Sequence, residues 1–275
     1  MNGTENSGGG SWDLLQGKPE FRAPDADASD EVPWSGKDVF VIVGLVALTL
    51  LAFALFFIPA IIALIVAINP GTDRTTLANS DVVVTLLLLL QWAIMLGVAF
   101  TYLKNKGYQV NPRTLGFKGT RLWRAAGLVL LVLIGSNIFD MVYGALIENL
   151  FGSDKLPSQV PTQNVTDLFG TSIFAMILTF IAVAIVTPMV EELFFRGIVH
   201  RGLEHRYGFI PGALMSSFIF SLAHVDYRLF IPIFVLGFGL AFLVHRTGTI
   251  WSSISVHFLV NSVGVIAQFV SPGNS

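Results

Sequence analysis

The sequence predicts an all-α fold, a polytopic bundle of about seven transmembrane helices. Of its 275 residues, 53% are hydrophobic and only 12% are charged, whereas soluble domains carry about 25% charged residues. The charged residues are also unevenly spread, because 11 of the 34 lie within the first 38 positions. Apolar runs of about 20 residues, the length that crosses a bilayer, recur through the remainder. These observations place most of the chain in a lipid bilayer.

Two regions of different composition follow from this distribution. Residues 1–36 are polar and acidic, and we expect them to form a disordered N-terminal tail. Residues 37–275 form the predicted transmembrane domain. A net charge of −2 and the lack of a basic run give no indication of a nucleic-acid partner. The chain has no cysteine, which excludes disulfides, thiolate catalysis and thiolate metal ligands.

The apolar runs define the predicted spans in order. The first ends at an Asn-Pro-Gly turn, and the third ends before the long polar loop 152–170. The fourth continues as helix towards residue 203, and the fifth and sixth are short and contain Pro211 and Pro232. The predicted spans are 39–68, 82–103, 125–151, 171–190, 209–223, 229–245 and 250–269.

Basic residues favour one orientation of these spans. Thirteen Lys and Arg residues lie on the side of the N-terminus and three on the other side. Cytoplasmic loops carry the excess of Lys and Arg, so we expect a cytoplasmic N-terminus. Seven spans then put the C-terminus on the opposite side.

An acidic pair interrupts the fourth apolar segment. Glu192 and Arg196 are four residues apart and share a helix face, so they can form an ion pair. Glu191 is turned about 100° away and cannot use the same partner well. Pro188, just upstream, weakens the helix and can help aim the pair. The alternative is that the two glutamates simply mark the cytoplasmic end of this span.

Two later apolar segments carry histidines. Phe220 and His224 are four residues apart on the fifth segment, and His257 and Asn261 have the same spacing on the seventh. Each pair therefore shares one helix face. A lone histidine in an apolar helix is more often a packing residue. Two histidines and an unpaired glutamate on three segments favour a shared site.

These side chains suit hydrolysis of an amide. A carboxylate in a low-dielectric site is suited to act as general base near neutral pH, here Glu191 assisted by His224. His257 and Asn261 would then supply donors to a tetrahedral oxyanion. The competing chemistry is zinc, with Glu191, His224 and His257 as three protein ligands. No HExxH motif is present, and Asn261 is a poor zinc ligand, so we prefer a mechanism without a cofactor.

The ordered motifs resemble those of a known family. EExxxR, FxxxH and HxxxN follow one another on successive apolar segments, and the match extends over about residues 171–265. This order is similar to the CPBP family of intramembrane proteases, also called the ABI family, which includes the type II CAAX prenyl endopeptidases. The motif residues are Glu191, Glu192, Arg196, Phe220, His224, His257 and Asn261.

The resemblance implies a function and a role for each motif residue. Glu191 would activate the attacking water with help from His224, while His257 and Asn261 would form the oxyanion hole. Glu192, Arg196 and Phe220 would support the site or position the substrate. We therefore expect an intramembrane endopeptidase of the bacterial plasma membrane. Its substrate would be a membrane-associated protein or peptide, with prenylated CAAX proteins among the candidates.

Two functions of other classes remain open from the sequence. Some members of the family are associated with bacteriocin self-immunity, so a non-proteolytic immunity factor or scaffold of the same fold is the first alternative. A proton-coupled carrier that uses Glu191 and the histidines as a relay is the second. Carriers often show an internal repeat, and none is evident in this sequence.

Overall fold

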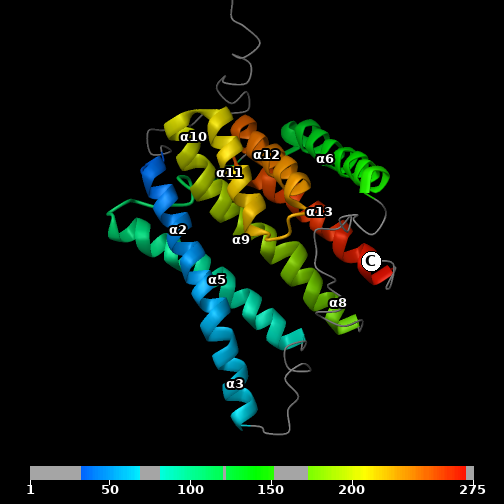
Figure 1. Cartoon of the computed structure of the whole chain (residues 1–275). Helices are drawn as coiled ribbons and strands as arrows, with labels where there is room; N and C mark the ends of the chain where they lie inside the picture. Colours follow the sequence, from blue (N-terminus) through cyan, green and yellow to red (C-terminus); the bar gives the residue numbers. More distant parts are fainter. Residues whose placement is uncertain (1–31, 69–80, 120–121, 152–172, 271–275) are drawn as a thin grey trace, which may run out of the picture.

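A computed structural model describes residues 32–68, 81–119, 122–151 and 173–270. The first 31 residues of the expected N-terminal tail lie outside these ranges. Within the described ranges the structure is helical and has no strand, which confirms the predicted helical bundle (Figure 1). The elements are α2 (Gly36–Ala52), η2 (Phe53–Phe57), α3 (Ile58–Ile68), α5 (Asp81–Asn105), α6 (Leu122–Phe151), α8 (Ile173–Thr179), η4 (Phe180–Val186), α9 (Thr187–Glu192), η5 (Leu193–His200), α10 (Arg201–Tyr207), α11 (Phe209–Ala223), α12 (Phe230–Thr247) and α13 (Ile250–Val270).

In the part of the chain that the structure describes, consecutive elements join into seven helical rods, because α2 to α3 and α8 to α10 are each continuous. Five rods are long and apolar enough to cross a bilayer. The two shorter apolar helices are α11 and the segment Trp251–Ala267 of α13. α13 contacts α6, α12 and the rod of α8 to α10 (Figure 1). The chain is therefore an integral membrane protein in which α13 packs against α6, α12 and the rod of α8 to α10.

The fourth rod is longer than the apolar run predicts. It is helical through Tyr207, and Gly208 then turns the chain with a φ of +82° that glycine adopts readily. α11 returns against α10, where a Cβ on Gly212 would lie 2.7 Å from the backbone nitrogen of Glu204. Gly212 therefore lets these two helices approach closely enough for α11 to run back alongside the fourth rod.

This geometry brings two distant motifs to the same depth. Glu191 lies 16 residues before Tyr207, about 24 Å along the rod at 1.5 Å per residue. His224 lies 15 residues after Phe209, about 22 Å along α11. Because α10 and α11 meet at one end, Glu191 and His224 are level with each other. Glu191 therefore lies in the middle of the helical rod Met176–Tyr207 and not at its end.

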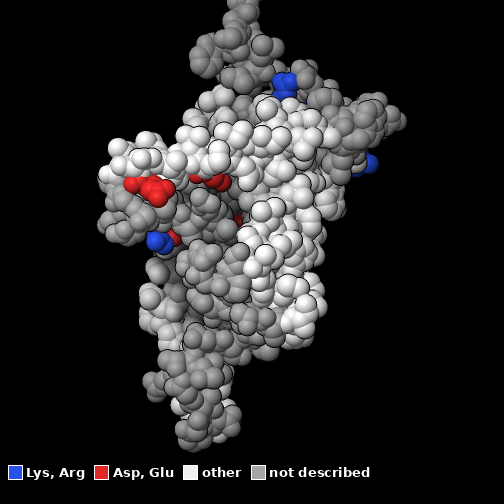
Figure 2. Space-filling model, turned by 90° about the vertical axis from the view of Figure 1, so that its right-hand side faces the viewer, with Lys and Arg blue, Asp and Glu red and all other residues white. Residues whose placement is uncertain are grey.

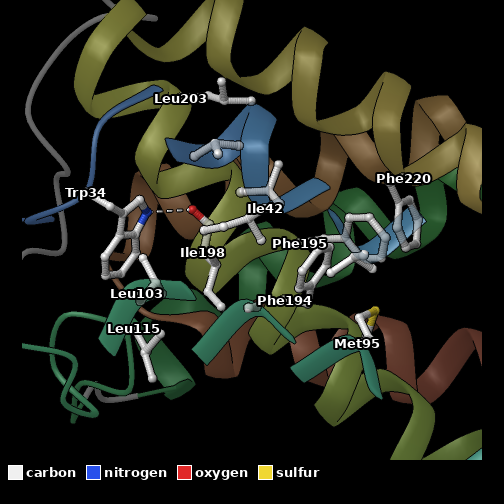
Figure 3. Packing of buried hydrophobic residues seen from close by; sticks show 14 of the residues in the cluster. Trp34, Ile42, Met95, Leu103, Leu115, Phe194, Phe195, Ile198, Leu203 and Phe220 are labelled. Atoms are coloured by element: carbon white, nitrogen blue, oxygen red, sulfur yellow. Dashed lines mark hydrogen bonds between the residues drawn. The ribbon is translucent and has the colours of Figure 1, made fainter. Parts of the chain in front are cut away.

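The first rod is fastened to the fourth by a buried tryptophan. Trp34 is 1% exposed, and its indole Nε1 donates a hydrogen bond of 3.0 Å to the carbonyl of Ile198 (Figure 3). Leu103, from α5, and Leu203, from α10, are also fully buried in this core. Val32 and Trp34 belong to this buried core although they precede the boundary that the sequence predicts for the tail.

Gly202 lies where the first and fourth rods approach each other closely. A Cβ there would lie 2.5 Å from Val39 Cγ2 and 2.7 Å from Trp34 Nε1. We expect Gly202→Ala to destabilise the fold by about 1–3 kcal/mol, because the core must shift to admit the methyl group. The measurement is thermal unfolding of the purified protein in detergent.

The matched control is Gly44→Ala in α2, since nothing lies within 4 Å of a Cβ at that exposed position. The control is expected to unfold at or slightly above the wild-type temperature, because alanine favours helix over glycine. Equal unfolding temperatures for Gly202→Ala and Gly44→Ala would contradict the close packing at Gly202.

Candidate active site

The acidic pair lies between two segments of π-helix. η4 precedes α9 and η5 follows it, and such insertions often occur at functional sites. At the end of η4 the N–H of Thr187 donates to the carbonyl of Ala182, five residues back. In this register the next carbonyl, that of Val183, would be paired with the N–H of Pro188. Proline has no N–H, so the Val183 carbonyl lacks this donor.

Asn261 supplies the missing donor from α13. Its Nδ2 donates to the carbonyl of Val183 at 2.9 Å, which joins the seventh rod to the fourth. An amide nitrogen carries two hydrogens, so one N–H of Asn261 remains available. Because Pro188 has no N–H, the carbonyl of Val183 is free to accept from Asn261 and holds its side chain in place.

Glu192 and Arg196 form the ion pair that their spacing predicts. Arg196 Nη1 lies 3.2 Å from Glu192 Oε1, and both side chains are at most 2% exposed. The same carboxylate oxygen accepts a hydrogen bond of 3.0 Å from Nδ1 of His257. A buried charge is expensive unless it is paired, and Glu192 has both a guanidinium and an imidazole against it. The buried ion pair therefore also orients a histidine on α13.

Arg196 has two further contacts that hold its side chain. Its Nη2 donates to the carbonyl of Gly237 on α12 at 3.1 Å. The guanidinium lies over the ring of Phe220, 4.2 Å from the ring centre, within the range of a cation–π interaction. The ring of Phe220 in turn packs edge-on against His224 and His257. Phe220 is thus the apolar floor beneath both histidines.

Both histidines present the same ring nitrogen to Glu191. Nδ1 of His224 donates to the carbonyl of Phe220 at 2.8 Å, and Nδ1 of His257 donates to Glu192. Each Nε2 is therefore the nitrogen left to face the site. From His224 it lies 4.0 Å from Glu191 Oε2, and from His257 it lies 3.8 Å from the same oxygen.

Glu191 differs from its neighbour in its surroundings. Its side chain is 18% exposed, and its buried Oε2 has no hydrogen-bond partner among the described residues. The distances to the two Nε2 atoms exceed the limit of about 3.2 Å for a direct hydrogen bond. A small polar group placed between Glu191 Oε2 and the two Nε2 atoms could therefore contact all three atoms.

The backbone after His224 is unusual. α11 ends at Ala223, and Val225 has a φ of +61°, a value that is rare for a β-branched residue. Beyond it, Arg228 donates to both carboxylate oxygens of Asp226 and lowers the pKa of this carboxyl. Such strain commonly accompanies functional sites. The turn ends α11 at the depth of Glu191 and so leaves His224 beside it.

Zinc fits this arrangement less well than a tetrahedral site requires. A tetrahedral zinc with Zn–N and Zn–O bonds of about 2.0–2.1 Å spaces its ligand atoms about 3.3–3.4 Å apart. The two measured distances from Glu191 are longer, 3.8 and 4.0 Å. Within the described ranges, no three His, Asp or Glu residues are placed to hold a metal ion.

The structure brings together most of the residues that the sequence singles out. Glu191, His224 and His257 converge, while Glu192, Arg196 and Phe220 lie directly behind them. Asn261 is one turn beyond His257 and points to Val183. The equal approach of both histidines to Glu191 was not expected, since the predicted roles assign only His224 to the water.

A second cluster was missed by the sequence analysis. His200 and His245 adjoin arginines in the sequence, a pattern typical of the membrane interface, yet their side chains are 0% and 8% exposed. Glu204 lies between them, with its Oε2 3.2 Å from His200 Nε2 and its Oε1 2.5 Å from His245 Nδ1. The spacing of His200 and Glu204 was the available signal, since i and i+4 share a helix face.

Comparison with known families gives an independent assignment of this region. Residues 173–263 match the family described as type II CAAX prenyl endopeptidase Rce1-like. This part of the chain is similar to the Rce1-like family. The matched region begins with α8 and ends within α13, close to the predicted limits of 171 and 265. It contains every residue of the candidate site.

Two bacterial relatives match over a longer stretch. YdiL of Bacillus subtilis, whose name proposes a membrane peptidase, is 32% identical over 148 residues, covering 54% of this chain and 56% of its own length. The membrane-embedded CAAX protease MroQ of Staphylococcus aureus is 27% identical over 161 residues, covering 54% of this chain and 59% of its own. The chain thus spans a little over half the length of these relatives. No solved structure matches the chain significantly.

Proposed function

We propose that this protein is an intramembrane endopeptidase that hydrolyses a peptide bond near the membrane surface, with Glu191 as the general base. The observation that carries the proposal is the convergence of two histidine Nε2 atoms on a carboxylate oxygen that has no hydrogen-bond partner among the described residues. The similarity to the Rce1-like family and two relatives named as membrane peptidases support the same reaction class.

The first step is attack by water on the scissile carbonyl. A water between Glu191 Oε2 and the Nε2 atoms of His224 and His257 donates one hydrogen to the carboxylate and the other to Nε2 of His224. As its oxygen bonds to the carbonyl carbon, the proton passes to Glu191, and the carbonyl oxygen becomes the tetrahedral oxyanion. General-base catalysis of this kind contributes about 10²–10⁴-fold to the rate.

The second step breaks the carbon–nitrogen bond. The oxyanion collapses, and the proton held by Glu191 passes to the departing amine. The products are a new carboxyl terminus and a new amino terminus, and Glu191 returns to the carboxylate. These two steps account for every proton and bond without a covalent enzyme intermediate or a cofactor.

We assign oxyanion stabilisation to His257 and Asn261. The remaining N–H of Asn261 is one donor, and His257 in its doubly protonated form supplies Nε2–H, with Glu192 accepting from Nδ1. Preorganised donors of this kind contribute about 2.7–4 kcal/mol each to transition-state stabilisation. The links to Glu192 and Val183 support this assignment, because each holds one of these side chains in a single orientation.

The proposed substrate is a membrane-associated protein or peptide. Prenylated CAAX proteins belong in the test panel because one relative is named a CAAX protease. The excess of basic residues on one side of the spans supports a cytoplasmic N-terminus in a bacterial plasma membrane.

Purified protein in proteoliposomes provides the test of function and of metal dependence together. We expect a mixture of bacterial membrane peptides to gain new termini, detected by mass spectrometry, and this cleavage to persist after treatment with 1,10-phenanthroline and EDTA. Loss of cleavage on chelation, with recovery on adding zinc, would overturn the metal-free mechanism. The absence of new termini across the peptide mixture and the prenylated panel would contradict the proposed function.

A further inference from the structure

A groove lies between α6, α12 and α13, next to the candidate site. Its lining combines apolar side chains with three polar ones from α6. The polar residues are Ser136, Asn137 and Asp140. None of the three belongs to the ordered motifs, and the proposed mechanism gives them no role.

Asp140 is the unexplained group in this groove. It lies 18 residues into the 30-residue helix α6, so it is far from both ends of an apolar span. Its carboxylate makes no hydrogen bond and no ion pair with any described residue, whereas Ser136 and Asn137 both donate to the carbonyl of Leu133. An ionisable group at membrane depth carries a penalty of at least about 2.5–3.5 kcal/mol on insertion scales, which indicates a function.

The groove adjoins the candidate active site through two of its walls. Ile233 lines the groove from α12 and belongs to the same buried cluster as Phe220, on which His224 and His257 pack. Val260 lines it from α13 and lies three residues after His257, on an adjoining part of the same face. A peptide bound at Glu191 can therefore extend into the groove along α13.

The charged lining of the groove has one sign. Figure 2 shows acidic atoms on one part of a face of the molecule, with basic atoms beside them and at two other places. Within the groove itself the lining includes one carboxylate and no Lys or Arg. Such a lining attracts a cationic group and repels an anionic one, and the low dielectric strengthens both effects.

We propose that the groove of α6, α12 and α13 is a substrate subsite, in which Asp140 pairs with a lysine or arginine side chain of the peptide. The aliphatic stem of such a residue would lie along Leu236 and Val260, and its charged end would reach the carboxylate. The inference rests on the proposed peptidase function and names the substrate class, a membrane peptide with a basic residue at a fixed distance from the cleaved bond. Asp140 is a specificity-determining residue in this account.

Cleavage profiling of a membrane peptide mixture in proteoliposomes tests the subsite. For the wild type we expect lysine and arginine to be enriched about tenfold or more at one position relative to the new termini. Asp140→Asn should abolish this enrichment while cleavage continues at other sequences, and Asp140→Lys should replace it with a preference for Asp or Glu. Glu148→Gln removes an exposed carboxylate from the same helix and should leave the profile unchanged.

The outcomes separate the subsite from the peptidase itself. If wild type and Asp140→Asn cleave with the same residue preferences, the subsite is overturned while the peptidase function stands. An equal change of profile in Glu148→Gln would also overturn it, because the effect would then reflect the general charge of α6. Failure of the wild type to cleave, in an experiment where its Glu191→Gln variant is equally inactive, contradicts the proposed function and with it the subsite.

Discussion

Replacement of Glu191 by glutamine is expected to lower the rate of peptide cleavage by about 10²–10⁴-fold, since an amide cannot take the proton of the attacking water. Glutamine keeps the size of the side chain and its contacts with both histidines. The fold should tolerate the change, because Glu191 Oε2 has no hydrogen-bond partner among the described residues and the side chain is partly exposed. Cleavage rate and thermal unfolding in detergent are measured on the same preparation.

The two readouts separate a catalytic role from a structural one. Glu191→Gln should be inactive with an unfolding temperature close to that of the wild type, and His224→Gln should show the same pattern with a smaller loss. Equal cleavage by Glu191→Gln and wild type would remove Glu191 as the base. A large fall in its unfolding temperature would show that the carboxylate is structural.

Replacement of Arg196 by methionine, unlike that of Glu191, is expected to destabilise the fold. The expected loss in the free energy of unfolding is about 3–5 kcal/mol. Without the guanidinium, Glu192 loses its ion-pair partner Arg196 at a position that is fully buried. The contacts of Arg196 with Gly237 and Phe220 disappear as well. Urea or thermal unfolding in detergent measures the effect, and poor membrane insertion is an extreme form of the same result.

The double variant Glu192→Leu with Arg196→Met is the control for this prediction. Apolar side chains of similar volume often replace a buried ion pair without loss, so we expect most of the stability to return. Cleavage should stay low, because Nδ1 of His257 no longer has an acceptor and its ring is free to turn. A double variant with wild-type cleavage would show that Glu192 does not orient His257.

Local features of the site could be predicted from the sequence because they depend on one helix alone. The Glu192–Arg196 pair follows from a spacing of four residues, and the structure has it. The same geometry gives the ion pair with Arg196 to Glu192 and not to Glu191 among the described residues. The helices were also predictable, since an apolar run long enough to cross a bilayer forms a helix there.

The position of Glu191 along its rod was harder to predict, because packing decides where a helix ends within an apolar sequence. The run of apolar residues stops near Val190, which suggested that Glu191 lies at a membrane surface. The rod continues to Tyr207 because its next turns are covered by α2 and α11, as the buried residues Ile198 and Leu203 show. Only this extension makes Glu191 level with His224.

Contacts between rods could not be predicted from one sequence. Nothing local indicates that the carbonyl freed by Pro188 is met by Asn261, or that Glu204 lies between two histidines from different rods. Trp34, placed in the expected tail, is fully buried for the same reason, since its partner Ile198 is 164 residues away. Tertiary packing decides these positions.

The most direct test of a water activated by Glu191 is a single-turnover cleavage in H₂¹⁸O, with the new carboxyl terminus read by mass spectrometry. The substrate is a peptide identified by cleavage profiling, and enzyme is in excess so that each molecule reacts once. Direct attack by water predicts one ¹⁸O atom in the new carboxyl group at the first turnover. A carboxyl group that contains only ¹⁶O at the first turnover would mean that the oxygen came from the enzyme, and would contradict the account.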